Sequence, residues 1–171
     1  MRRKTSARPG RTGLPAVMVA ALVLAGSCGG GGGGRSLADL AEGNWNCTWR
    51  ETSAVDLGGS GAGQDVKVTA KITPDNDSHG KFQLKLTEGT QDVALAGTWR
   101  LSGTELTVAI THNSFAPGGG GTLVYRGVTP DARMIEVKDP PTPVDVSHRG
   151  GSYEFRWGSP DDIQDQLTCH R

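Results

Sequence analysis

The side chains that could carry out chemistry are few and scattered along this sequence of 171 residues. The histidines His79, His112, His148 and His170 have no short spacing of the kind that pairs two metal ligands. No Gly-x-Ser-x-Gly motif is present to place a serine nucleophile. Acidic residues are spread over the chain, and nothing distinguishes a catalytic pair among them. We therefore predict a protein that is not an enzyme and that uses no metal or other cofactor.

The N-terminal segment has the pattern of an export signal. Its first 13 residues contain five basic residues and no acidic one, and residues 14–24 form an apolar run of the usual length. That run is shorter than the roughly 20 apolar residues of a membrane-spanning helix. The next segment, Leu24-Ala25-Gly26-Ser27-Cys28, resembles the lipobox of bacterial lipoproteins, in which the cysteine is lipidated and becomes the first mature residue. The alternative is an ordinary signal cleaved nearby, which would leave Cys28 as a free thiol.

The lipobox resemblance implies a signal peptide over residues 1–27 and a lipid anchor on Cys28, on the extracytoplasmic face of the cell membrane. Six glycines follow at 29–34, so we interpret 28–35 as the lipidated cysteine and a flexible tether. Removing the signal removes five of 18 basic residues and none of 18 acidic ones, which leaves a net charge of about −5. This charge argues against nucleic acid as a partner and leaves the lipid as the contact with the membrane.

The segment 36–171 is long enough for one domain with one hydrophobic core. It contains two cysteines, Cys47 and Cys169, and the default for such a pair in an oxidising compartment is a disulfide. The bond would close a loop of about 120 residues. In the chain-entropy model this contributes on the order of 4–5 kcal/mol to the free energy of unfolding.

Apolar and polar residues alternate through most of this segment, which is the pattern of β-strands with one buried face. The alternation is clear in Trp45-Asn46-Cys47-Thr48-Trp49, and turn-forming residues separate the later strands. We predict an all-β fold: an antiparallel β-barrel or meander of about eight to nine strands, with a β-sandwich as the alternative. The expected strands lie at 45–50, 66–72, 81–87, 91–101, 104–111, 121–127, 131–137 and 151–157, and the main turns at 73–77, 88–89, 102–103, 117–121 and 140–143.

Short helical turns are expected near both ends of the domain. Ser36 can cap the first, with Asp39 at the capping-box position. The second, at 159–162, has a cap and a proline at its first position, and a short strand carrying Cys169 would follow. If Cys169 must reach Cys47, the first and last strands are neighbours, as in a closed barrel.

Gly43-Asn44-Trp45, which follows the first helical turn and opens the first strand, resembles the Gly-x-Trp signature of lipocalins. The segment 97–106 is similar to the mid-barrel hairpin of small lipocalin-like lipoprotein domains. The resemblance implies an eight-stranded cup in which Trp45 packs at the closed end. It also implies that a late arginine, Arg171 or Arg156, covers this tryptophan.

The chain has nine aromatic residues, and most of them lie in expected strands at same-face spacing. They could simply fill a core, because small barrels pack their interiors with side chains. They could instead line a cup that takes an apolar small molecule. Trp45 is expected to be a structural plug. The candidate ligand-binding residues are Trp49, Trp99, Tyr125, Tyr153, Phe155 and Trp157.

The sequence thus predicts a membrane-anchored, extracytoplasmic, non-enzymatic lipoprotein that binds a small hydrophobic ligand in its barrel. The alternative is a structural or protein-interaction lipoprotein with a solid core, acting in envelope assembly or as an inhibitor. In that case the loops at 116–122 and 139–143 would be the surfaces presented to a partner.

Overall fold

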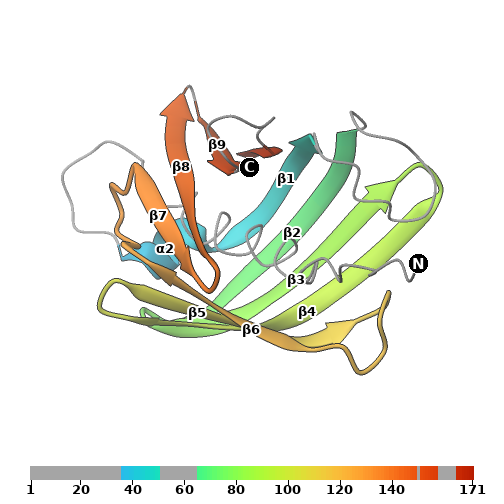
Figure 1. Cartoon of the computed structure of the whole chain (residues 1–171), viewed down its shortest axis with the longest axis horizontal. Helices are drawn as coiled ribbons and strands as arrows, with labels where there is room; N and C mark the ends of the chain where they lie inside the picture. The colour runs from blue at the N-terminus through green and yellow to red at the C-terminus, as the bar shows by residue number, and fades with distance from the viewer. Residues whose placement is uncertain (1–35, 51–64, 150, 158–164) are drawn as a thin grey trace, which may run out of the picture.

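One antiparallel sheet closes on itself to form the domain (Figure 1). The computed structural model describes residues 36–50, 65–149, 151–157 and 165–171. Each strand pairs with the next along the chain, and the last pairs with the first. The all-β, antiparallel barrel is confirmed, with ten strands where eight to nine were expected. They are β1 (Gly43–Arg50), β2 (Asp65–Asn76), β3 (His79–Glu88), β4 (Gln91–Ser102), β5 (Glu105–Asn113), β6 (Gly121–Arg126), β7 (Met134–Lys138), β8 (Pro141–Arg149), β9 (Ser152–Trp157) and β10 (Asp165–His170).

The period-two pattern sorts the side chains between the two faces of the wall. In β2, Val66, Val68 and Ile72 are buried while Lys67 and Lys71 are exposed. The same alternation runs through β3 and β10. The inward residues form a single buried cluster, so the core lies inside the barrel.

The strand β8 was missed by the sequence analysis, which expected a turn over 140–143. The turn is shorter, and β8 begins at Pro141. Pro141 and Pro143 pair with β7 but lie beyond the last pair that β8 makes with β9, between Val144 and Trp157. Among the described residues, this part of β8 pairs with β7 alone, as at the edge of a sheet, where a residue without an N–H costs no second ladder bond.

The turn expected at 73–77 is also shifted, because β2 continues to Asn76. The register of β2 against β3 changes between Pro74 and Asn76, so the proline is accommodated at an irregularity of the ladder. The Asn76 Oδ1 atom accepts hydrogen bonds from the backbone N–H groups of Ser78 (2.9 Å) and His79 (3.1 Å). This short asparagine-based turn closes the hairpin.

The first helical turn is confirmed as α2 (Leu37–Ala41), with the expected capping box between Ser36 and Asp39. Its Leu37, Ala38 and Ala41 join the buried cluster of the barrel. Five residues cannot cross a bilayer, and no helix within the described ranges has the length and apolar character to do so. The second expected helical turn, at 159–162, lies outside the described residues, as do the signal peptide 1–27 and the tether 28–35.

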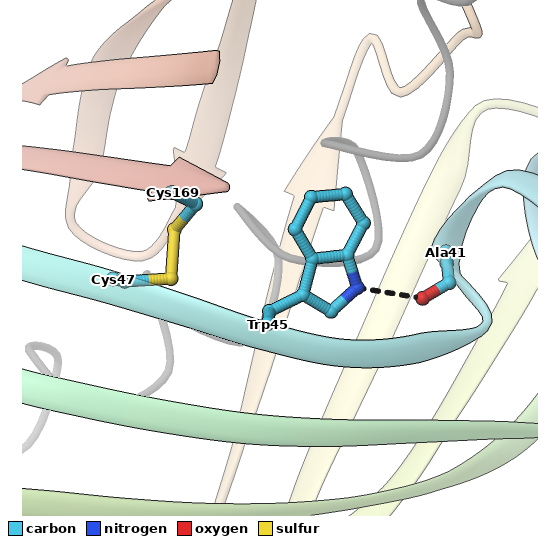
Figure 2. The surroundings of a disulfide bond; sticks show 4 residues. All are labelled: Ala41, Trp45, Cys47 and Cys169. Atoms are coloured by element: carbon cyan, nitrogen blue, oxygen red, sulfur yellow. Dashed lines mark hydrogen bonds between the residues drawn. A yellow bond between two sulfur atoms is a disulfide. The ribbon is translucent and has the colours of Figure 1, made fainter. Parts of the chain in front are cut away.

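Trp45 sits where α2 meets β1, as Figure 2 shows. Its Nε1–H donates to the carbonyl oxygen of Ala41 at 2.9 Å. The guanidinium of Arg171 lies over the indole, and Arg171 also donates to the carbonyl oxygen of Leu40. Of the two arginines considered for this position, Arg171 occupies it, whereas Arg156 pairs with Glu154 on β9.

The predicted disulfide between Cys47 and Cys169 is present (Figure 2). The two residues lie directly opposite each other in β1 and β10, with their Cα atoms 4.1 Å apart. The bond therefore joins the first strand to the last at the place where the barrel closes.

The closure is least extensive between β6 and β7. Within the described residues these strands share two paired positions, Tyr125 with Val137 and Arg126 with Glu136. By contrast, β2 and β3 are paired along almost their whole length. The extent of pairing between neighbouring strands thus differs around the wall, and Tyr125 lies at the described junction with the fewest pairs.

Candidate ligand-binding site

The barrel interior brings together all the aromatic residues predicted to contact a ligand. They come from four strands, and each is buried within the same cluster. Phe155 and Trp157 from β9 face Leu167 and Asp165 of β10 in the register. The side chains predicted as ligand contacts are therefore gathered on one continuous inner surface. They are Trp49 on β1, Trp99 on β4, Tyr125 on β6, and Tyr153, Phe155 and Trp157 on β9.

Tyr153 belongs to the Trp45 end of this surface. Its ring meets that of Trp45 edge to face, with centroids 5.9 Å apart, and the ring of His148 lies 4.6 Å away. Together with Arg171, whose guanidinium lies over Trp45, these rings form a cluster that we call the aromatic plug. The structure thus gives Tyr153 a packing role next to Trp45.

Among the residues that the structure describes, three other interior side chains have a polar atom that is buried without a hydrogen-bond partner. These atoms are the Nε1 of Trp49, the Nε1 of Trp99 and the hydroxyl oxygen of Tyr125. The side chains are 2 %, 1 % and 0 % exposed, respectively. Buried indole N–H and phenol O–H groups usually find a partner, and each one left unpaired costs about 1–3 kcal/mol. Trp45, whose Nε1–H is paired with Ala41, shows the usual arrangement within the same chain.

The strand order places these three groups around the inner wall. Tyr125 on β6 and Trp49 on β1 are five strands apart in a ring of ten, which puts them on opposite sides. Trp99 on β4 lies opposite Val108 of β5. Tyr125 lies opposite Leu106 of the same strand. Trp99 and Tyr125 therefore flank β5 from its two sides.

Burial also changes the acidity of Tyr125. Removal from water disfavours the phenolate and raises the pKa of Tyr125 above its ordinary value. The hydroxyl consequently keeps its proton throughout the neutral and moderately alkaline range. It can serve as a hydrogen-bond donor there but not as a base.

Two glycines that the sequence analysis did not single out determine how the aromatic rings fit. Gly80 of β3 pairs with Trp99, and Gly97 of β4 pairs with Phe82. A Cβ atom at Gly80 would lie 2.9 Å from the Trp99 ring, and one at Gly97 would lie 2.7 Å from the Phe82 ring. Each ring thus packs over a glycine of the neighbouring strand. An isolated glycine within the expected strand 91–101 was the signal that could have identified Gly97. Gly80 lies just before the expected strand 81–87, so no such signal marked it.

A buried acid was also missed. Asp165, the first residue of β10, is the one charged residue that is buried among the described residues, and it lies opposite Trp157. Its carboxyl group places acidic character at the end of the interior where β10 begins. Asp165 is preceded in the sequence by two other acids, so nothing in the pattern marked it as buried.

Several surface hollows lie outside the barrel wall. One of about 380 Å³ is lined by outward polar residues of β8, β9 and β10, including Asp145, Glu154 and Arg156. Another of about 500 Å³ lies between residues 131–133 and 146–148. None of the six candidate aromatic residues lines either hollow, because all six belong to the buried cluster inside the barrel. Within the described ranges, no group of three or more His, Cys, Asp or Glu residues is placed to hold a metal ion.

Fold and interior define the class of protein: a closed, ten-stranded antiparallel β-barrel with a disulfide across its closure and a short helix against one end. No known family model matches the sequence, and no curated protein matches it. Among solved structures, the chain is similar to a de novo designed fluorescence-activating β-barrel. The sequence identity is 14 % and the TM-score 0.40, and the match covers 76 % of this chain and 92 % of the designed one.

Proposed function

We propose that this protein is a lipid-anchored, extracytoplasmic β-barrel that binds a small, mostly apolar molecule in its interior and catalyses no reaction. One observation carries the binding proposal: an apolar inner wall that bears unpartnered polar atoms on Trp49, Trp99 and Tyr125. A core built only for packing gains nothing from these groups, because a phenylalanine in place of Tyr125 would avoid the cost of the unpaired hydroxyl. A bound molecule would provide the missing partners.

The binding proposal is tested on full-length protein purified from detergent-solubilised membranes. We expect native mass spectrometry to show a bound small molecule, which is released when the protein is reduced and unfolded in the same detergent. The unfolded sample is the control for molecules carried by the micelle. A folded, disulfide-bonded protein that carries no small molecule and takes up no neutral apolar probe would contradict the proposal.

The rival function, a protein-interaction lipoprotein, is favoured by two exposed apolar side chains. Phe115, in the loop between β5 and β6, is 62 % exposed, and Met134, at the start of β7, is 60 % exposed. Both lie outside the barrel interior and could contact a protein partner. Co-purification of one stable protein partner, with no small molecule bound, would support this function over the binding of a ligand.

The lipid anchor is supported by the segment 24–28 and its resemblance to a lipobox. After reduction, the intact mature protein should show two free thiols, from Cys47 and Cys169, and a mass shift from lipid on Cys28. The variant Cys28→Ala should lose this lipid mass and the firm association with membranes. Three free thiols and no lipid shift in the natural protein would reject the anchor.

A further inference from the structure

Two of the unpartnered polar atoms lie on the same part of the inner wall. Trp99 and Tyr125 stand on β4 and β6, on either side of β5, opposite Val108 and Leu106. These two residues of β5 are buried and face the interior two positions apart. Two strand spacings separate the backbones of β4 and β6 by roughly 10 Å. A small molecule bound between these two side chains would therefore be able to contact both.

The unpartnered polar groups of the inner wall act as hydrogen-bond donors. An indole N–H can only donate, and a phenol O–H can donate or accept. The indole N–H groups of Trp49 and Trp99 thus each require an acceptor, and the Tyr125 hydroxyl can also donate to an acceptor. The complementary group on a ligand is an oxygen with lone pairs, such as that of a ketone, an ester or an ether.

The charges around the interior argue against an anionic ligand. Lysine, arginine and histidine are absent from the buried side chains of the described residues, whereas Asp165 is buried. An anion in an apolar interior without a counter-charge carries a large desolvation cost. A carboxylate or phosphate would therefore meet no buried lysine, arginine or histidine in the part of the wall that the structure describes.

We infer that the barrel selects a neutral, mostly apolar molecule that presents an oxygen acceptor to Trp99 and Tyr125. This inference rests on the proposed binding function and specifies its ligand class. The apolar body of the ligand would contact residues such as Leu106, Val108 and Phe155, and its oxygen would accept from the wall formed by β4, β5 and β6.

The test uses three probes with a phenyl ring and a four-carbon chain: butylbenzene, butyrophenone and 4-phenylbutyrate. The first has no acceptor, the second has a ketone, and the third has a carboxylate. Binding to the full-length protein is measured by equilibrium dialysis, with protein-free micelles as the blank. The variant Tyr125→Phe removes the hydroxyl and keeps the ring. The matched control, Thr107→Val, removes a hydroxyl from the outward side of β5, between Leu106 and Val108.

We expect Tyr125→Phe to weaken butyrophenone binding about tenfold, which is about 1.4 kcal/mol, and to change butylbenzene binding less than twofold. Thr107→Val should change neither. The carboxylate probe should bind more weakly than the ketone at pH 7. The variant Trp99→Phe gives a second measurement: it should weaken both neutral probes through lost packing, and the ketone by a larger factor.

The outcomes separate the inference from the function on which it rests. If both neutral probes bind and Tyr125→Phe leaves the ratio of their affinities unchanged, the barrel binds ligands but the acceptor inference is wrong. The same result is expected if an ordered water is the partner of the hydroxyl. Tighter binding of 4-phenylbutyrate than of butyrophenone would also overturn the inference. If no probe binds to the folded protein, the binding function itself fails.

Discussion

The guanidinium carbon of Arg171, the last residue of the chain, lies 4.7 Å from the centroid of the Trp45 ring near the start of β1. The same guanidinium donates to the carbonyl oxygen of Leu40, next to the Ala41 carbonyl that accepts from Trp45. The guanidinium of Arg171 thus contacts both the end of α2 and the face of the Trp45 indole. Within the aromatic plug, this contact joins the two ends of the domain.

Replacing Arg171 by alanine should therefore loosen the plug. We expect the free energy of unfolding to fall by about 1–3 kcal/mol, from the lost cation–π contact and the lost hydrogen bond. Urea denaturation followed by tryptophan fluorescence measures the change. The control is Arg156→Ala, which removes an exposed partner of Glu154 and should cost less than about 1 kcal/mol. Equal losses in the two variants would contradict the assignment of Arg171 to the plug.

The variant Cys47→Ala/Cys169→Ala should be strongly destabilised. The bond links residues 122 positions apart, and its loss should lower the free energy of unfolding by about 4–5 kcal/mol in the chain-entropy model. Reduction of the natural protein should reproduce most of this change, whereas the same reductant should leave the double variant unaffected. A fully reduced protein with unchanged stability in urea would show that the barrel closes without help from the bond.

Gly97→Ala should disturb the contact between β3, β4 and β5. The new methyl group would overlap the carbonyl oxygen of Ala109 as well as the ring of Phe82, and a backbone atom cannot move aside at low cost. We expect a loss of about 1–3 kcal/mol in the free energy of unfolding. The matched control is Gly121→Ala on β6, where an added Cβ atom meets nothing within 4 Å. A neutral Gly97→Ala substitution would mean that Phe82 and β5 shift readily.

Tyr125→Phe should alter how stability depends on alkaline pH. Burial raises the pKa of Tyr125 in the folded protein, whereas in the unfolded chain the group ionises near its ordinary value of 10.0. Below pH 10 the Tyr125 hydroxyl is protonated in both the folded protein and the unfolded chain. Above this pH only the unfolded chain releases the proton, so the natural protein should lose up to about 1.4 kcal/mol per pH unit relative to the variant.

The measurement compares urea unfolding of the two proteins between pH 8 and 11. Below pH 10 the variant should be as stable as the natural protein, or more stable by up to about 3 kcal/mol, because its unpaired hydroxyl is gone. Parallel stability curves up to pH 11 would show that Tyr125 reaches solvent in the folded state. A clear loss of stability at pH 8 would show that the hydroxyl has a partner.

The sequence was informative wherever alternation was strict and a covalent constraint limited the topology. Trp45, Cys47 and Trp49 defined the inner face of β1, and Cys169 required β10 to lie beside it. The choice between Arg171 and Arg156 could not be made from the sequence. It depends on the tertiary structure, in which Arg171 follows the end of β10 next to Trp45, whereas Arg156 is an exposed residue of β9.

The errors in the strand and turn bounds arose at prolines, whose backbone restrictions are accommodated by the tertiary structure. Prolines at 74, 141 and 143 indicated turns, but Pro74 lies at a register shift and the other two lie beyond the last described pair of β8 with β9. The interior aromatic residues were predicted from their spacing. Which of them would lack a hydrogen-bond partner was not predictable, because this depends on the atoms around each polar tip.

The bond between Cys47 and Cys169 also determines how the domain can bear tension. A force applied at Ser36 and Arg171 reaches the bridge after α2 and residues 43–46 on one side, and after His170 on the other. Beyond these points the load passes from sulfur to sulfur. The chain from β2 to β9 lies within the covalent loop and is shielded from the pull. Tension between the ends of the domain therefore acts on the pairing of residues 43–46 with β2 and leaves the rest of the barrel wall unloaded.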